Sequence, residues 1–404
     1  MRSAPTRRTV WVGAMSLAQL VSWGSLYYTF SLLMPAMEQD LGLSRVQVSG
    51  AFSAALLASG VAGLPVGRWI EQGYGRRVMA GGSLLAGLLL IGHAFISGMI
   101  GLYLTWIGLG LAMGAIFYEP VFAITIRRWP TDYRKPIIAM TFLGGLASTA
   151  FIPLTAWLLS EMDWRQTCMV LAGLHLLLCL PIHLVMLADE APGTARKTLQ
   201  ARPEVADAAG PSLHELTRSA AFMLVSGCVI GLSLLSAALS AHMVPLLSER
   251  GLPASWAVAV PASIGALQVL GRLVLFVFEG RFDPRSIDRA IPWLLPASLA
   301  ILLASGGSVI GALVFATCYG VGNGLITIMK ATSIAAYVSR ERVAVLSGLQ
   351  SFPVALARSV GPVLTAVLWS VTSSYGLALI VLTAVGVISA LMLHSAQRHA
   401  LRAD

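Results

Sequence analysis

Residues 220–244 read AAFMLVSGCVIGLSLLSAALSAHMV, a run of 25 positions without Asp, Glu, Lys or Arg. The hydrocarbon core of a bilayer is about 30 Å thick, so a helix needs roughly 20 mostly apolar residues to cross it. Other stretches along the chain have the same character. The sequence predicts spans at 9–36, 45–70, 78–98, 100–127, 136–160, 166–188, 217–248, 254–279, 290–306, 308–337, 343–370 and 374–395.

The composition of the 404 residues indicates the same class of protein. Hydrophobic residues make up 57% of the chain and charged residues 11%, and the mean hydropathy is +0.79. Soluble domains carry about 25% charged residues. The sequence therefore predicts an all-α membrane protein with twelve transmembrane helices, in contact with the lipid bilayer over most of its length.

The net charge of +9 is explained by topology and not by nucleic-acid binding. If the N-terminus lies inside, 20 of the 27 Lys and Arg residues fall in cytoplasmic segments. The opposite side holds only Arg45, Arg165 and Arg250. By the positive-inside rule both termini are cytoplasmic. We expect a multi-pass protein of a bacterial cytoplasmic (inner) membrane, with no nucleic-acid partner.

Residues 189–216 are rich in Ala, Pro and charged residues and separate six spans from six. This stretch is typical of a flexible linker. It divides the chain into an N-terminal six-helix bundle at 1–188, a cytoplasmic linker at 189–216 and a C-terminal six-helix bundle at 217–404.

The two halves also repeat each other. Pro35 matches Pro245, and Pro153 matches Pro362 at nearly the same offset. The glycines of the fourth span recur in the tenth, as Gly108, Gly110 and Gly114 against Gly320, Gly322 and Gly324. Duplicated halves that enclose a site near the membrane midplane are one known transporter architecture.

Motifs of enzymes are missing from the sequence. It contains no phosphate-binding loop, no metal-ligand spacing and no nucleophile motif. The four cysteines, Cys168, Cys179, Cys228 and Cys318, fit neither a zinc nor a redox pattern. We expect no enzymatic activity, no cofactor and no bound metal, and transport that is not driven by ATP hydrolysis within this chain.

Charged residues within the spans are the strongest functional candidates. Each costs about 2.5–3.5 kcal/mol on insertion scales, so those that persist usually face a cavity. Arg358 lies in LQSFPVALARSVGPVLTAVLW, far from both ends of its span. Two interpretations remain open: Arg358 contacts an anionic substrate, or it forms a structural ion pair with another helix.

Three more charged residues lie inside predicted spans. Arg272 either faces the cavity or extends toward the inner membrane surface. Glu119 and Lys330 occupy equivalent depths in the fourth and tenth spans. They either form a salt bridge across the two halves, or Glu119 carries a proton, because burial disfavours the charged carboxylate.

The balance of these charges indicates the charge of the substrate. Arg272, Arg358 and Lys330 are positive, and only Glu119 is negative. Isolated buried charges are costly, and Arg binds a carboxylate through two hydrogen bonds, so a cavity with surplus positive charge favours an organic anion. Tyr27 and Tyr28 in the first span either offer hydroxyls to this ligand or pack against neighbours. Asn323 and Gln350 are further candidates for substrate contact.

The segment GLPVGRWIEQGYGRRVM, Gly63–Met79, resembles the loop signature of the major facilitator superfamily, and the resemblance extends over essentially the whole chain. The resemblance implies two pseudo-symmetric six-helix bundles and alternating access. It also implies a cytoplasmic gate formed by Gly63, Gly67, Glu71, Arg76 and Arg77.

The segment Ile126–Gln166 is similar to the branch of monocarboxylate transporters and oxalate/formate antiporters. The matching features are Arg128–Trp129, Gly144–Gly145, Pro153 and Trp164–Arg165, in that order. That branch uses basic residues in its eighth and eleventh helices to hold carboxylates. The resemblance assigns these roles to Arg272 and Arg358.

The expected function is secondary active transport of a small organic anion, a mono- or dicarboxylate, by proton symport or by exchange for a counter-anion. We expect the protein to act as a monomer. The first alternative is a proton-coupled exporter of hydrophobic or cationic compounds. The second is a membrane receptor or scaffold without transport, which would normally carry a soluble signalling domain.

Overall fold

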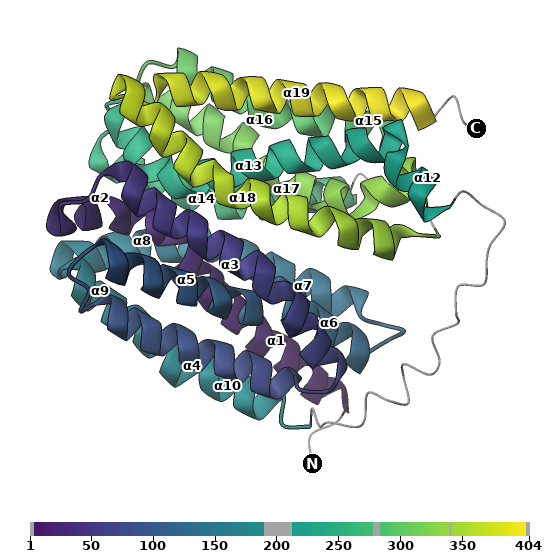
Figure 1. Cartoon of the computed structure of the whole chain (residues 1–404), viewed down its shortest axis with the longest axis horizontal. Coiled ribbons are helices and arrows are strands. Elements are labelled where there is room, and N and C mark those ends of the chain that lie inside the picture. The colour runs from purple at the N-terminus through teal and green to yellow at the C-terminus, as the bar shows by residue number, and fades with distance from the viewer. Residues whose placement is uncertain (1–3, 190–211, 278–282, 340, 401–404) are drawn as a thin grey trace. The chain divides into compact units, whose positions relative to one another are not determined.

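The computed structural model describes residues 4–189, 212–277, 283–339 and 341–400. Helices and turns account for these residues, and no strand occurs among them. The chain divides into two compact units, residues 1–206 (unit 1) and 207–404 (unit 2). In Figure 1, unit 1 runs from purple to blue and unit 2 from teal to yellow. The predicted linker at 189–216 lies mostly, at 190–211, outside the described residues.

Unit 1 contains six long helical rods, several of which are interrupted. The elements of the first three rods are α1 (Ala4–Trp23), the π-helical turn η1 (Gly24–Tyr28) and α2 (Phe30–Leu41); α3 (Arg45–Glu71); and α4 (Gly75–His93). The other three rods are α5 (Met99–Ile116) with α6 (Tyr118–Arg128); α7 (Arg134–Gly145) with α8 (Ala147–Glu161); and α9 (Trp164–Leu174), the π-helical turn η2 (His175–Cys179) and α10 (Leu180–Met186).

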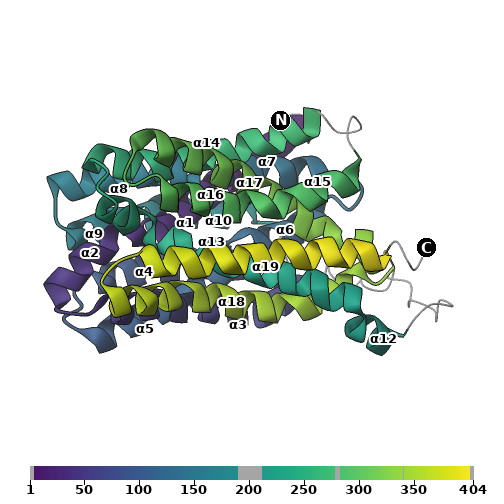
Figure 2. The same cartoon turned by 90° about the horizontal axis from the view of Figure 1, so that it is seen from above.

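Unit 2 begins with the short helix α12 (Leu213–Arg218) and continues with six rods. These are α13 (Ala220–Glu249); α14 (Ala254–Val277); α15 (Pro284–Ala290) with the 3₁₀ turn η3 (Ile291–Trp293) and α16 (Leu294–Ala304); α17 (Val309–Tyr337); α18 (Val343–Thr372); and α19 (Gly376–Ala400). Figures 1 and 2 both show α18 beside α19.

Within the described ranges, ten helices are long and apolar enough to cross a membrane. The two other predicted spans are also helical. The first is the interrupted rod from Ala4 to Leu41, and the third is α4, which starts with the charged pair Arg76–Arg77. All twelve predicted segments are therefore helical, and the chain is an integral multi-pass membrane protein.

Several of the predicted spans are interrupted. The fourth rod breaks at Phe117, which is extended between α5 and α6. Pro120 causes the break, because a proline cannot donate to the carbonyl four residues earlier and its ring collides with that carbonyl. The carbonyl in question belongs to Ile116, and the buried Gln19 side chain donates to it from Nε2 at 2.7 Å.

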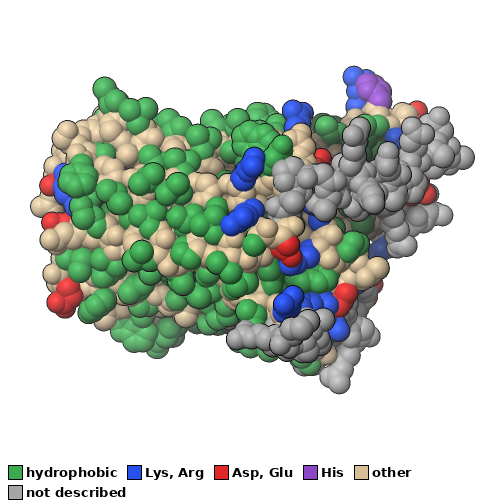
Figure 3. All heavy atoms as spheres, turned by 90° about the horizontal axis from the view of Figure 1, so that it is seen from below, with side chains coloured by type: hydrophobic (Ala, Val, Ile, Leu, Met, Phe, Trp, Pro, Cys, Tyr) green, Lys and Arg blue, Asp and Glu red, His purple; other side chains and the backbone are tan. Residues whose placement is uncertain are grey.

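Hydrophobic side chains cover most of the face shown in Figure 3, and Lys and Arg gather toward one side of it. The most exposed large apolar residues include Leu64, Phe95, Ile100 and Leu177, between 71% and 81% exposed. Exposed apolar side chains in such number would promote aggregation in water. A lipid environment accounts for them, since a bilayer is as apolar as these side chains.

Close helix packing at glycines repeats in the two units. In unit 1, a Cβ added at Gly110 or Gly114 would collide with the carbonyl of Ala55 or Ser59 on α3. In unit 2, a Cβ at Gly324 would collide with the carbonyl of Gln268 on α14, and Gly320 lies against Ile264 and Leu267. Only glycine allows this approach, which explains why glycines recur in the fourth and tenth rods.

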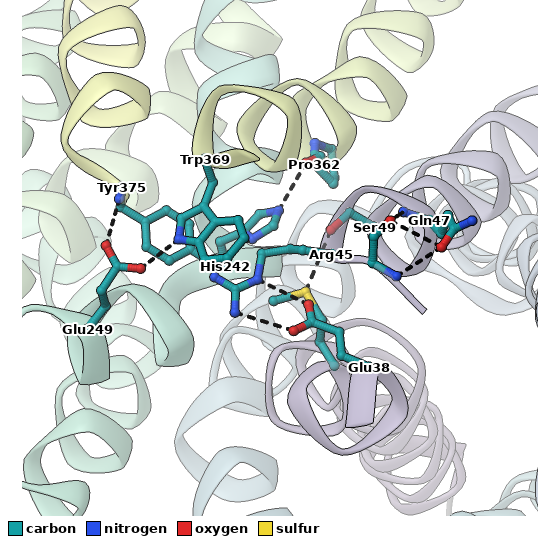
Figure 4. A network of polar contacts seen from close by, with 11 residues as sticks. Glu38, Arg45, Gln47, Ser49, His242, Glu249, Pro362, Trp369 and Tyr375 are labelled. Carbon is teal, nitrogen blue, oxygen red and sulfur yellow. Dashed lines mark hydrogen bonds and ion pairs between the residues drawn. The ribbon is translucent and has the colours of Figure 1, made fainter. Parts of the chain in front are cut away.

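An acidic residue at the end of the first rod of each unit also has an equivalent role. Asp40 accepts from Arg165 Nη2 at 2.6 Å and from Trp164 Nε1 at 3.3 Å, at the start of the sixth rod. Glu249 accepts from Trp369 Nε1 at 2.6 Å and from the backbone N–H of Tyr375 at 2.7 Å, where α19 begins (Figure 4). Each carboxylate therefore ties the first rod of its unit to the sixth.

Candidate functional site

The candidate substrate-binding residues of unit 2 lie on α14, α17 and α18. Arg358 is half-buried in the middle of α18, between Pro353 and Pro362. Lys330 on α17 lies close enough to Arg358 for the two positive charges to repel each other. Two cations on neighbouring helices raise the local positive potential, which a bound anion would neutralise.

Lys330 is held by a hydroxyl and not by a carboxylate. Its Nζ donates to Ser233 Oγ on α13 at 2.7 Å, and Ser233 in turn donates to the Val229 carbonyl at 2.6 Å. Within the described part of unit 2, Lys330 forms no ion pair. A neutral partner satisfies one donor and leaves the positive charge uncompensated.

Arg272 reaches from α14 across to α17. Its Nε donates to the Gly324 carbonyl at 3.3 Å, and its Nη2 lies 3.5 Å from Thr327 Oγ1. The neighbouring Gly271 makes this approach possible, since a Cβ there would lie 3.1 Å from the backbone of Val321. The sequence left two interpretations of Arg272 open, and its orientation toward a substrate cavity stays a prediction.

The two predicted amides both bind serines of α13. Asn323 Oδ1 accepts from Ser236 Oγ at 2.9 Å, and Gln350 Nε2 donates to Ser226 Oγ at 3.2 Å. With Ser233 at Lys330, three serines on one face of α13 contact three predicted site residues. Sequence reasoning missed these serines, although their spacing of seven and three residues within an apolar helix places them on one face.

The predicted tyrosines of unit 1 belong to an aromatic cluster around η1. The Trp23 ring stacks on Phe117 with a centroid distance of 4.1 Å, and Tyr27 lies 5.3 Å from Trp23 and 5.2 Å from Tyr28. Tyr27 is buried, whereas Tyr28 is half-buried. Of the two, Tyr28 is therefore the better placed to offer its hydroxyl to a ligand.

The surroundings of η1 hold this cluster in place. Thr29 Oγ1 lies 3.2 Å from Thr155 Oγ1 on α8, and the Gly24 backbone packs directly against the Phe151 ring. π-Helical turns are rare and occur frequently at functional sites. Tyr27 and Tyr28, which the sequence singled out, are part of this turn, and Thr29 follows it directly.

Glu119 lies in the first turn of α6, directly after the break at Phe117. Its side chain is exposed. The burial of Glu119 that was assumed for a proton carrier is therefore not observed. A salt bridge between Glu119 in unit 1 and Lys330 in unit 2 stays a prediction.

The predicted gate residues lie around the turn from α3 to α4. Gly63 and Gly67 have open space where a Cβ would stand, and Glu71 is exposed. The Arg77 guanidinium lies 5.4 Å from the Tyr74 ring, and Arg76 is half-buried. The Arg127 side chain donates to the Ile70 carbonyl and so ties this turn to the end of α6. Their role as a gate stays a prediction.

Arg128 and Trp129, at the end of α6, contact residues of α1 and of the segment that follows α10 in unit 1. Arg128 Nη1 donates to Asp189 Oδ1 at 2.9 Å, and the Trp129 ring meets Trp11 edge-on at 5.0 Å. Burial alone would raise the pKa of Asp189, but the hydrogen bond and charge of Arg128 hold it below its usual value. Both motif residues are therefore structural contacts of unit 1.

No group of three or more His, Cys, Asp or Glu within the described ranges could hold a metal ion. The candidate residues themselves offer charge, hydrogen bonding and aromatic contact, which are suited to binding a polar organic solute.

The helical architecture and the polar groups inside its apolar rods define a polytopic membrane transporter. The chain belongs to the Major Facilitator Superfamily, whose sequence model matches residues 15–362. This family and fold indicate a transporter and not an enzyme, with a small-molecule substrate. The prediction of this family from Gly63–Met79 is confirmed.

Curated relatives include monocarboxylate transporter 13 of Bos taurus, 36% identical over 124 residues, and that of Rattus norvegicus, 33% identical over 123 residues. Each match covers 29% of this chain and 28% of the relative, so the chain matches less than a third of their length. The resemblance to the monocarboxylate branch is thereby confirmed.

Solved structures with a similar fold include a bacterial homolog of the human lysosomal transporter Spinster, with a TM-score of 0.72, 15% identity and 99% coverage of both chains. A second is the nucleoside transporter NupG, with a TM-score of 0.70, 14% identity and coverage of 96% of this chain and 98% of that one. At such low identity these likenesses establish the fold alone.

Proposed function

We propose that this protein transports a small organic anion, a mono- or dicarboxylate, by alternating access. The observation that carries the proposal is the neighbouring pair Lys330 and Arg358 inside the apolar rods of unit 2. Lys330 donates to the Ser233 hydroxyl and forms no ion pair within the described part of this unit. Arg358 would bind carboxylate through two hydrogen bonds, and Lys330 would add a point charge.

Other residues would complete the binding of the substrate. Arg272 on α14 would provide further positive charge, Tyr28 or Tyr27 a hydroxyl, and Asn323 and Gln350 amide contacts. The partial relationship to monocarboxylate transporter 13 supports the same class of substrate. The carrier would work by proton symport, with Glu119 as the proton-carrying group, or by exchange against a counter-anion.

The setting of this activity is part of the proposal. By the positive-inside rule both termini would lie in the cytoplasm, and the host membrane would be a bacterial inner membrane. Residues 1–188 and 217–404 would act as two bundles joined by the linker at 189–216. The gate would comprise Gly63, Gly67, Glu71, Arg76 and Arg77, and the protein would act as a monomer.

The test is ligand binding and uptake by purified protein. Thermal stabilisation by a panel of mono- and dicarboxylates reports binding to the folded state, and uptake into proteoliposomes reports transport. Arg358→Gln should abolish both, while Arg358→Lys should retain part of the binding because it keeps the charge but loses the bidentate geometry. His214→Ala, at an exposed position of α12, serves as the control.

A second candidate function rests on unit 1. The aromatic rings of Trp23, Phe117 and Tyr118 beside the exposed Glu119 suit a hydrophobic cation, since aromatic faces and carboxylates attract cations. This candidate is a proton-coupled exporter. Stabilisation by lipophilic cations that is lost in Glu119→Gln and retained in Arg358→Gln would establish it in place of anion transport.

A further inference from the structure

A groove on unit 1, away from the candidate substrate residues, has a polar mouth and apolar walls. It runs between α1 and α7 and has a volume of about 450 Å³. Arg8 and Lys135 lie at one end, and Val12, Gly13, Ala139 and Leu143 line its length. Neither end of this groove includes a residue assigned above to the substrate.

The walls of the groove are small or apolar and open outward. Gly13 and Ala139 are exposed, and Leu143 is 37% exposed. Ser16 at the base does not make it polar, because its hydroxyl donates to the Val12 carbonyl of its own helix at 2.7 Å. The groove is therefore apolar along most of its length, and the small residues Gly13 and Ala139 form part of its walls.

The mouth of the groove carries surplus positive charge. The half-buried Arg8 and the exposed Lys135 line it, and the exposed Arg7 and Arg134 precede them directly in the chain. One acid, Asp132, is occupied by Arg8, whose Nη1 donates to Oδ2 at 2.7 Å and whose Nη2 donates to the Asp132 carbonyl at 2.5 Å. Lys135 lines the groove and forms no ion pair with any described residue, and its charge acts on Asp132 only as a weaker addition to that of Arg8.

We propose that this groove binds an anionic phospholipid, with its phosphate at Lys135 and an acyl chain along Gly13, Ala139 and Leu143. The two ends of the groove match the two parts of such a molecule. Basic pockets between membrane helices are suited to anionic head groups. A soluble phosphate would contact only the basic residues and would leave the apolar walls uncovered. A phospholipid would contact both the basic residues and the apolar walls.

The test compares lipids with purified full-length protein in phosphatidylcholine nanodiscs. Titrated phosphatidylglycerol should raise the melting temperature, and additional phosphatidylcholine should not. Lys135→Gln should weaken the apparent affinity about fivefold, as expected for one basic group near a membrane surface. Ala139→Leu should also weaken binding by filling the groove, while leaving an exposed helical position with a good helix former.

Two comparisons decide between this site and simpler explanations. Arg218→Gln removes an equally exposed basic residue at the end of α12, where no groove is involved. If it weakens phosphatidylglycerol binding as much as Lys135→Gln, general surface attraction explains the effect and the site is refuted. Glycerol phosphate carries the head group alone, and stabilisation equal to that by the lipid would also overturn the proposal. The experiment measures lipid binding, so the proposed lipid site can be confirmed or refuted independently of the transported substrate.

Discussion

Ser25 and His175 join the two π-helical turns of unit 1. Ser25 lies in η1 of the first rod and His175 in η2 of the sixth, and Ser25 Oγ lies 2.8 Å from His175 Nε2. Both side chains are buried, at 3% and 0% exposure. A π turn widens its helix by one residue and shifts the side chains that follow. The bond thus fixes two irregular turns against each other next to Tyr27 and Tyr28.

Removing this bond is expected to destabilise unit 1. Ser25→Ala leaves the buried His175 ring nitrogen without this partner, which costs about 1–3 kcal/mol. His175→Ala leaves the Ser25 hydroxyl bonded to the Val21 carbonyl at 2.7 Å, so its cost comes from the loss of a buried ring. The double variant should lose less than the sum of the two single variants, because the partner left behind is also removed. Thermal unfolding in detergent measures all three, with the exposed His214→Ala as control. Additive losses would show that the two side chains do not interact.

The rods of the fold could be predicted from the sequence because their signal is local. A run of about 20 apolar residues is sufficient to predict a span. The breaks were harder, because they depend on partners far away in the chain. Only the structure shows that the helix breaks at Phe117 and that the Gln19 side chain donates to the Ile116 carbonyl.

The candidate site could be predicted only in part, for a similar reason. Intramembrane charge marked Arg358, Lys330 and Arg272, since charge in lipid is costly. Ser233 was not predicted, because a serine can bond to its own helix backbone and so carries no such cost. It became a site residue only through its contact with Lys330.

The charge of Lys330 is expected to contribute to anion affinity. Lys330→Gln keeps a donor near Ser233 and removes the charge, and a charge-assisted hydrogen bond is worth about 1.5–3 kcal/mol. Carboxylate affinity should therefore fall at least about tenfold. Lys330→Arg should retain more of it. Titration by thermal shift measures the change, and unaltered affinity in Lys330→Gln would exclude Lys330 from the substrate site.

Two carboxylates of unit 1 are expected to make stability depend on pH. The hydrogen bond from Arg8 lowers the pKa of Asp132, and Arg128 lowers that of Asp189 against the opposing effect of burial. A lowered pKa in the folded state means that each pair stabilises the fold above the usual value of 3.8. That contribution is lost as the pH falls through the lower, folded-state pKa.

Melting temperatures of the parent chain, Asp132→Asn and Asp189→Asn between about pH 3 and pH 7 test this dependence. The difference between each variant and the parent should be largest near pH 7 and shrink at acid pH. A difference that stays constant across the range would mean that the effect of the substitution does not come from the ionised carboxylate.

Gly324 is expected to be essential for the packing of α17 against α14. A Cβ there would lie 2.9 Å from the Gln268 Cα and even closer to its carbonyl oxygen, and neither is a flexible group that could move aside. Gly324→Ala should therefore separate the two helices and displace Arg272, which donates to the Gly324 carbonyl. Overpacking of this kind costs about 1–3 kcal/mol or more. Gly348→Ala on α18 meets open space and should be neutral or stabilising, since Ala is the better helix former. Thermal unfolding compares the two variants, and equal melting temperatures would contradict the close approach of α14 and α17.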